Sequence, residues 1–503
     1  MSKFHRAAAN LQLCAKSQLH CTNRIDYDLS KQAGKTQRDE RIRFTGLGAT
    51  SHYLKQMTVR LVFFIRTMVS VVEDEAAGES ISEVPVVEVN NQNFSELVVH
   101  FCRALSKASL IAIDLELTGL GQAGQYYNHL QQRYEAYKGA AETRSVLAVG
   151  VAIFSLRKTK DKCIKYKSRV FNFLTTSNQP FVADPDSLKF LRTHGFDFNR
   201  HCEMSIGYTP AHLSSEVKPK YRKDLMKTVW KSILDANVPI AFHNGFVDAV
   251  FIYSHFMDTL PSTSDEFVAK LSLIFDDQRT LLDSKYLMEY SVRSTTSFLL
   301  YMFRKCQREN FLESKCSRAY LKIRFPKPAA LLDHMSSTNC ELPNHVISDQ
   351  MEGGLSIKPL LCPKYKDHGF CSRIACDRVH DVDLVLDVEE LEQRRIRARR
   401  KRRHEQISDT ATESSDRGKL LPDVETLLKS RRSQFGSGGS HNAGMDAFMT
   451  GFSVLYFNRM KILRDKPVFD EYCNIFPLPG KHYGLRLKTA VDRTSLFEAP
   501  CLK

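Results

Sequence analysis

The strongest constraint on the fold is an apolar run that contains two acids, Leu110-Ile-Ala-Ile-Asp-Leu-Glu-Leu117. Eight residues of this kind predict a buried β-strand, on which positions i and i+2 point to the same face. Asp114 and Glu116 therefore lie side by side, and the desolvation of two like charges is unfavourable. A divalent cation offsets that cost, and hard carboxylate oxygens suit Mg²⁺. On this motif alone, a strand with a solvated acidic face remains the alternative.

Strands and helices alternate along the first half of the chain. Apolar strands are predicted at 86–89, 145–156, 170–174 and 239–242, and helices at 94–107, 221–235, 246–256 and 445–460. This alternation is typical of an α/β fold with a largely buried central sheet. The 503 residues are 43% hydrophobic and 26% charged, which is enough to fold around a substantial core.

Two further acids come at the start of predicted helices. Asp248 ends the segment His243-Asn-Gly-Phe-Val-Asp248, and Asp446 ends the segment His441-Asn-Ala-Gly-Met-Asp446. Taken singly, each acid has a structural explanation as a helix-dipole partner or cap, worth ~0.3–1 kcal/mol. The order Asp-x-Glu, then Asp, then His-x4-Asp is much more specific than any part of it. The whole set therefore favours a functional site over a purely structural origin.

These segments resemble the DEDD-type 3′–5′ exonucleases of the histidine-containing subgroup, and more closely the nuclear Caf/Pop-type deadenylases. The similar text also includes Thr143-Arg-Ser145, Phe190-Leu191, His194-Gly-Phe196, Asp283-Ser-Lys-Tyr286, Phe303-Arg-Lys-Cys306 and Ala447-Phe-Met-Thr-Gly451. The resemblance covers roughly residues 84–384 and 436–490. It implies a ribonuclease-H-like fold, with Asp283 as a supporting residue and not a metal ligand.

The resemblance also implies a role for each residue of the set. Asp114, Glu116 and Asp446 would hold one Mg²⁺, and Asp114 with Asp248 would hold the second. His441 would orient or deprotonate the attacking water, for which a pKa near neutrality is suited. The implied product is a 5′-nucleotide, which is AMP when the 3′ tail is adenosine.

A cysteine cluster, Cys362-x8-Cys371-x4-Cys376-x3-His380, supplies three thiolates and one imidazole, enough for one tetrahedral Zn²⁺. The thirteen cysteines are an odd number and no secretory signal is readable, so a reducing compartment is expected. The pattern is similar to CCCH zinc fingers. Tyr365 and Phe370 alternate with cations in the cluster and predict stacking on single-stranded RNA. A purely structural zinc knob is the alternative.

A basic run near residue 400 packs eight cations into ten positions and supplies more than half of the formal net charge of +15. Its cations are Arg394, Arg395, Arg397, Arg399, Arg400, Lys401, Arg402 and Arg403. We interpret the run as a nuclear localisation signal read by an import receptor. An electrostatic RNA arm and a solvated helix face stay open as alternatives.

Composition and linkers divide the chain into six parts. We expect a poorly ordered extension at 1–80, the first part of an exonuclease core at 84–350 and a zinc finger at 355–384. A basic signal and flexible linker follow at 385–440, then the final part of the core at 441–490 and a tail at 491–503. The finger is thus inserted into the exonuclease core.

The expected protein is a nuclear exoribonuclease that trims 3′ oligo(A) tails from RNA with two Mg²⁺ and carries one Zn²⁺. Its expected partners are single-stranded 3′ tails of RNA, an import receptor and small nuclear ribonucleoproteins. The resemblance suggests small nuclear and other non-coding RNAs as substrates, and Cajal bodies, nucleoli or speckles as locations. No apolar stretch approaches the ~20 residues that span a bilayer. Two alternatives remain: a non-catalytic RNA-binding adaptor and a DNA 3′-end exonuclease.

Overall fold

The computed structural model describes residues 80–121, 127–213, 224–276, 279–347, 361–373, 376–405, 442–464, 472–481 and 483–487. The expected extension lies outside this part except for residue 80, and the tail at 491–503 lies outside it entirely. His441 also lies outside the described residues, immediately before Asn442.

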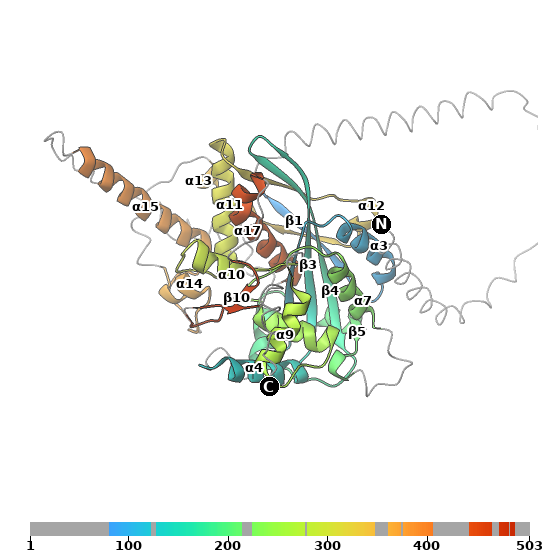
Figure 1. Cartoon of the computed structure of the whole chain (residues 1–503). Coiled ribbons are helices and arrows are strands. Elements are labelled where there is room, and N and C mark those ends of the chain that lie inside the picture. Colours follow the sequence, from blue (N-terminus) through green and yellow to red (C-terminus); the bar gives the residue numbers. More distant parts are fainter. Residues whose placement is uncertain are drawn as a thin grey trace, which may run out of the picture. The chain divides into compact units, whose positions relative to one another are not determined.

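A mixed sheet forms the centre of the described chain (Figure 1). Its strand order is β7-β6-β2-β3-β4-β1-β9. Strands β5 and β8 also pair with β4. The strands are β1 (Glu83–Val89), β2 (Leu110–Leu117), β3 (Val146–Lys160), β4 (Cys163–Ser177), β5 (Ile206–Tyr208), β6 (Ile240–Phe242), β7 (Leu281–Asp283), β8 (Tyr320–Arg324) and β9 (Met335–Asn339), with β10 (Ile475–Phe476) and β11 (Leu485–Arg486) forming a separate pair.

Helices cover both faces of this sheet. The α-helices are α3 (Phe94–Leu105), α4 (Leu130–Thr143), α5 (Pro185–Thr193), α6 (Phe198–Met204), α7 (Leu225–Asp235), α8 (Phe246–Ile252), α9 (Ser264–Ile274), α10 (Ser284–Tyr286), α11 (Leu299–Lys315), α12 (Ala329–Leu332), α13 (Asn344–Ile347), α14 (Pro363–His368), α15 (Val382–Glu405) and α17 (Ala443–Leu463). No described helix is both long and apolar enough to cross a bilayer.

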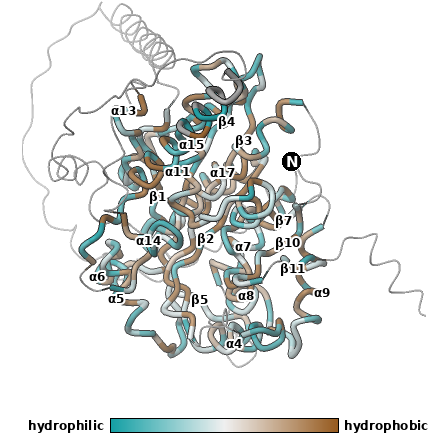
Figure 2. Tube along the Cα trace, turned by 90° about the vertical axis from the view of Figure 1, so that its left-hand side faces the viewer, coloured by the Kyte–Doolittle hydropathy of each residue, from teal (hydrophilic) through white to brown (hydrophobic). Residues whose placement is uncertain are grey.

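Side-chain alternation on β2 divides the core between the two faces of the sheet. Ile111 and Ile113 pack in one cluster with α3 and α7, whereas Leu110 and Ala112 pack in the other with α17. On the first face, the ring of Phe101 meets β4 in edge-to-face contacts, each worth ~0.5–1.5 kcal/mol beyond its buried area. Figure 2 shows apolar trace along the central strands and hydrophilic trace on outer helices such as α4 and α14.

Helix α17 lies close against β2, β3 and β4 because small residues face the sheet. A Cβ built on Gly451 would lie 2.3 Å from Cε2 of Phe154 and 3.0 Å from Cβ of Ala112. Phe154 in turn stacks on Phe448, with ring centroids 5.6 Å apart. The approach of this late helix to early strands brings the start of α17 to the carbonyl end of β2.

Candidate active site

Asp114 and Glu116 lie near the carboxyl end of β2, on the face that α17 covers. Asp114 is half-buried and Glu116 is 7% exposed. In the antiparallel pairing with β3 their partners are Gly150 and Ala148, and the register shifts between Glu116 and Leu117. The apolar neighbours therefore hold two carboxylates together at the point where the regular strand ends, as the sequence predicts.

Asp446 comes to the same place from the first turn of α17. Asn442 caps this helix: its side-chain oxygen accepts hydrogen bonds from the backbone N–H groups of Gly444 and Met445, at 2.9 and 3.3 Å. The start of the helix rests on Gly150, the cross-strand partner of Asp114. One ligand oxygen from each of Asp114, Glu116 and Asp446 lies within 4.8 Å of the other two.

Asp248 lies in the first turn of α8, the helix that follows β6. Strand β6 runs parallel to β2, and α8 follows it after the turn at 243–245. The Asp248 carboxylate accepts a hydrogen bond from the backbone N–H of Leu115, the residue between the two acids of β2. Asp248 is not part of the 4.8 Å carboxylate cluster, but its charge raises the pKa of Asp114.

Asp283 fixes the turn that carries Asp248. Its fully buried carboxylate accepts from the backbone N–H groups of Asn244 and Gly245, at 3.2 and 2.8 Å. It also accepts from the N–H groups of Lys285 and Tyr286 and so caps α10. Asn244 has a φ of 59°, a left-handed conformation that asparagine tolerates better than most residues. Asp283 is therefore a positioning residue, in agreement with the role expected from the sequence.

The electrostatics of the site favour a bound cation. Burial and the charges of Asp446, Asp248 and Glu116 raise the pKa of Asp114 well above its usual range. Burial and the charge of Asp283 raise the pKa of Asp248 to about 7. Such shifts mean that full ionisation of the cluster is unfavourable, because like charges repel each other in a poorly solvated site. A hard divalent ion with oxygen ligands fits this donor set and offsets the repulsion.

The loop after β2 is braced by an ion pair that the sequence analysis did not identify. Arg144 donates to Asp184, with its Nη2 at 2.7 Å from Oδ1, and Gly121 donates its N–H to the same carboxylate at 2.9 Å. This hydrogen bonding lowers the pKa of Asp184. Arg144 belongs to one of the segments that resemble the exonuclease family. Nothing in the sequence pointed to Asp184 except its position before Pro185, where it is the N-cap residue of α5.

His243, in the turn between β6 and α8, is unsuited to act as a base near neutrality. The Nδ1 of His243 lies 2.9 Å from Oγ of Ser284. Burial and the charge of Lys285 lower the pKa of His243 to about 3. The role of general base thus stays with His441 as a prediction, since that residue lies outside the described part.

The predicted zinc ligands meet in a second cluster. One ligand atom from each of Cys362, Cys371, Cys376 and His380 lies within 4.8 Å of the other three. The ends of the segment are joined by a bridge between Leu361 and Val379. A hydrogen bond from the backbone N–H of Tyr365 is the largest cause that lowers the pKa of Cys362, to about 6. Three thiols and an imidazole at this spacing fit tetrahedral Zn²⁺.

The two aromatic residues of this segment have different surroundings. Tyr365 stacks on His380 with ring centroids 5.0 Å apart and lies 5.9 Å from the ring of Phe298 in the core. Phe370 is 65% exposed. RNA contact remains a prediction for both, and only the Phe370 ring is largely free to stack on a base.

The basic run forms the second half of α15, so its backbone is helical, as one of the alternatives predicts. Buried ion pairs hold the first half of α15 to α11: Arg304 Nη2 lies 2.8 Å from Asp383 Oδ2, and Arg308 Nη1 lies 2.7 Å from Asp387 Oδ1. Both arginines are almost fully buried. The helix therefore continues into the cationic segment from an anchored start, and the role of the run as an import signal stays a prediction.

A carboxylate cluster at the carboxyl end of a central strand, completed by an acid from a helix late in the chain, is typical of metal-dependent nucleases with a ribonuclease-H-like fold. The chain belongs to the CAF1 family: the model described as CAF1 family ribonuclease matches residues 89–228 and 223–454. The α/β, ribonuclease-H-like fold expected from the sequence is confirmed, and the Cys/His cluster fits an inserted zinc finger. Nucleases of this family use divalent metals.

Curated relatives match only part of their own length. The poly(A)-specific ribonuclease PARN of Danio rerio is 26% identical over 151 residues, 27% of this chain and 22% of that protein. The pre-piRNA 3′-exonuclease trimmer of Bombyx mori is 23% identical over 132 residues, 24% of each. The S. pombe Pop2p structure with Mg²⁺ and Mn²⁺ has 17% identity and a TM-score of 0.34, covering 44% of this chain and 82% of that one. This structural likeness is too weak to place individual residues.

Proposed function

We propose that this protein is a divalent-metal-dependent 3′–5′ exoribonuclease that trims 3′ oligo(A) tails of small nuclear and other non-coding RNAs in the nucleus and releases 5′-AMP. The observation that carries the proposal is the convergence of Asp114, Glu116 and Asp446, with Asp248 beside them, in a CAF1-family ribonuclease. The names of the zebrafish and silkworm relatives describe enzymes that act on RNA, one of them at the 3′ end.

The carboxylates supply the ligands and the protein supplies their placement. Asp114, Glu116 and Asp446 would hold one Mg²⁺, and Asp114 with Asp248 the other. Bound ions of this kind stabilise the attacking and leaving oxygens of phosphoryl transfer. Asp283 holds the turn before Asp248, and Asn442 holds the start of α17, so both acids are positioned before substrate arrives. His441 would accept a proton from the attacking water.

The decisive assay follows shortening of 5′-labelled RNAs that end in A, U or mixed tails, with and without Mg²⁺. We expect Mg²⁺-dependent shortening of the A tail, and its loss in the variant Asp114→Ala with Glu116→Ala. The matched control, Asp333→Asn with Glu142→Gln, changes two exposed acids and should keep wild-type activity. Full activity in the double alanine variant would refute the site assignment.

The same assay separates the proposal from its two alternatives. A non-catalytic RNA-binding adaptor would bind the labelled RNA but leave its length unchanged under every metal condition. A DNA 3′-end exonuclease would shorten a matched DNA oligonucleotide faster than RNA. Both alternatives lose support if RNA alone is shortened in a Mg²⁺-dependent manner.

Nuclear location and the import receptor rest on the basic half of α15. Replacing residues 399–403 by alanine should retain the protein in the cytoplasm, because the receptor would lose a dense cationic segment. Alanine substitution of Lys189, Lys231 and Lys270, exposed cations on other helices, is the control. Unchanged nuclear import of the 399–403 variant would remove the signal from the proposal.

A further inference from the structure

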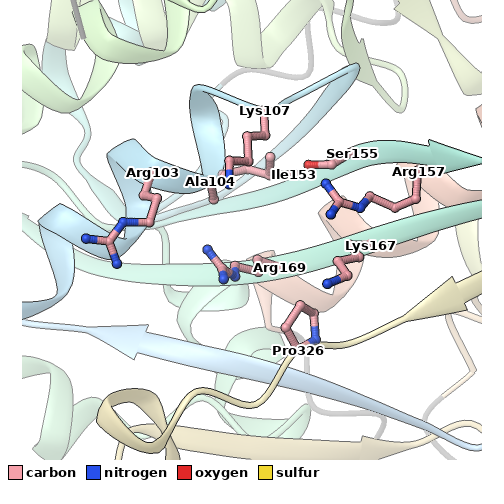
Figure 3. Close-up of a pocket in the computed structure, with 9 residues that line it drawn as sticks. All are labelled: Arg103, Ala104, Lys107, Ile153, Ser155, Arg157, Lys167, Arg169 and Pro326. Carbon is pink, nitrogen blue, oxygen red and sulfur yellow. The ribbon is translucent and has the colours of Figure 1, made fainter. Parts of the chain in front are cut away.

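A small cavity lined by cations lies on the face of the sheet opposite the carboxylate cluster. It has a volume of about 100 Å³ and lies between the end of α3 and the strands β3 and β4. Figure 3 shows its charged side chains, and they come from all three elements. The cationic residues that line it are Arg103, Lys107, Arg157, Lys167 and Arg169. Five cations around one small space are suited to an anion.

Strand register extends this positive charge beyond the cavity. Lys158 of β3 pairs with Lys165 of β4, which pairs in turn with Lys322 of β8. Along β4, Lys165, Lys167 and Arg169 share one face because side chains alternate, whereas Ile164 and Tyr166 on the other face are buried in the core. The three strands therefore present adjacent rows of cations on one face, which we call the cationic sheet face.

Within the described chain, four of the five cations that line the cavity lack a carboxylate partner. Within the described residues, no carboxylate forms an ion pair with Arg103, Lys107, Arg157 or Arg169. Burial and the neighbouring Arg103 lower the pKa of Arg169. Like charges directly opposite each other on neighbouring strands are destabilising. A bound anion would relieve this repulsion, so the arrangement indicates a ligand and not a stabilising core feature.

The dimensions select the kind of anion. The cavity is well below the ~300–1,000 Å³ typical of small-molecule sites, so it admits a single anionic group and not a whole metabolite. The rows beyond it span three strands, at ~4.8 Å from strand to strand. The cavity can hold one anionic group while the paired cations on β3, β4 and β8 contact further ones, an arrangement that suits a polymer of phosphates.

We propose that the cationic sheet face binds the phosphodiester backbone of the RNA upstream of its 3′ tail. This inference rests on the proposed function, since it assigns a second contact to the same substrate. Gly150 is the partner of Asp114, and Ser155 in the cavity lies five residues further along β3, or ~17 Å at strand spacing. The cavity is also on the other face of the sheet. A short tail in the active site therefore does not reach it, whereas a longer RNA does.

The test compares oligo(A) of ~3 nucleotides with an RNA of ~30 nucleotides ending in A, lengths on either side of the common ~4–16-nucleotide single-strand sites. Binding is measured in EDTA, with no hydrolysis, for the full chain and for Lys165→Gln with Arg169→Gln. Each phosphate contact adds ~0.7 to the salt slope for single strands, so two lost contacts reduce it by ~1.4. The variant's deficit on the long RNA should then be ~7-fold greater at ~50 mM than at ~200 mM salt.

Several outcomes support or refute the inference. Unchanged binding of the short oligo(A), together with an unchanged or raised Tm, supports it, because the variant removes repulsion and not packing. The control Lys189→Gln with Lys270→Gln removes two exposed charges elsewhere and should leave the salt slope unchanged. Equal salt slopes for wild type and the Lys165–Arg169 variant would overturn it. So would intact RNA binding with lost binding of polyglutamate, which would assign the face to an acidic protein.

Failure of this inference is distinguishable from failure of the proposed function. The proposed function is tested by Mg²⁺-dependent shortening of the short oligo(A), a reaction that does not need the cationic sheet face. The inference is tested by metal-free binding of the long RNA. An enzyme that shortens oligo(A) but shows no effect of the Lys165–Arg169 variant refutes the inference alone.

Discussion

Replacing Gly150 by alanine adds a single methyl group, which should reduce activity strongly while the protein still folds. Gly150 pairs with Asp114 on the central strands, and the start of α17 rests directly on it. A Cβ built there would lie 1.9 Å from both the carbonyl carbon and the oxygen of Ala443, and 2.4 Å from the nitrogen of Gly444. Ordinary contacts between carbon atoms lie at ~3.5–4.0 Å, so Gly150→Ala requires a shift of ~1.5 Å. All the atoms concerned are backbone atoms and cannot rotate aside.

The shift should act mainly on the reaction. Asp446 follows Ala443 by one helical turn and must move with it. A misplacement of ~1 Å in a catalytic group can cost ~10²-fold in rate, and overpacking costs ~1–3 kcal/mol in stability. We therefore expect kcat for oligo(A) shortening to fall by about two orders of magnitude, at a temperature where the variant remains folded. Thermal unfolding and single-turnover rates measure the two effects separately.

Two other glycines provide the controls. Gly139 lies on α4 with no atom within 4 Å of a built Cβ, so Gly139→Ala should keep full activity and stabilise the protein by ~0.4–1 kcal/mol. Gly451 faces the sheet five residues beyond Asp446 on α17, and Gly451→Ala should lower stability with a much smaller effect on kcat. Wild-type kcat in Gly150→Ala would refute the reasoning, as would equal losses of kcat in the Gly150 and Gly451 variants.

Three further predictions concern the pH dependence of stability, the Cys/His cluster and the buried ion pairs between α11 and α15. The folded pKa of Asp248, about 7, lies above the ordinary carboxyl value of 3.8. The metal-free protein should therefore lose stability as pH rises from about 4 to about 7, and Mg²⁺ should restore that stability at pH 7. Urea unfolding of the metal-free protein measures this, and a rise in stability over that range would contradict the prediction. Cys371→Ala should lower the zinc content measured by atomic absorption from one per chain and release the segment around Phe370 to proteolysis, while oligo(A) shortening continues; undiminished zinc would exclude the cluster. Arg308→Ala should destabilise the fold by ~3–5 kcal/mol, because Asp387 loses a buried partner, and a loss under ~1 kcal/mol in urea unfolding would show that the ion pairs contribute little.

Local apolar patterns were sufficient to predict the strands and helices that carry the site. The strand expected at 110–117 is β2, and the helix expected at 445–460 lies within α17. The strand expected at 170–174 is only the middle of β4, which spans Cys163–Ser177. Its first half alternates lysine with apolar residues and packs on one face only, so a search for continuous apolar runs misses it.

Helices α11 and the first half of α15 could not be recognised by the same means. Charge in a sequence normally indicates solvent, yet Arg304 and Arg308 are almost fully buried. Their partner Asp383 lies more than seventy residues further along the chain, and the two helices are brought together only by the fold. The burial of a cation depends on a distant partner, which no local pattern contains.

The site itself was predicted as a set of acids, but the parts that position them were only partly accessible. Asp283 was expected to support the site, and the structure identifies its partners as the backbone N–H groups of Asn244 and Gly245. Gly150 carried no signal, since its importance arises from contact with a helix almost three hundred residues later. Carboxylate chemistry is visible in residue types, whereas positioning depends on backbone approach.

The distribution of charge gives the two cationic regions different expected roles. The basic run supplies +8 of the net +15, and residues 157–169 contain seven cations and one acid, or +6. These two segments together supply +14, so the rest of the chain carries a net charge of +1. The run follows the first half of α15, which the buried ion pairs hold to α11, whereas the cations of residues 157–169 are fixed in register on paired strands. A fixed array loses less conformational entropy when it binds a polymer, so neutralising residues 157–169 should weaken RNA binding more than neutralising the run does.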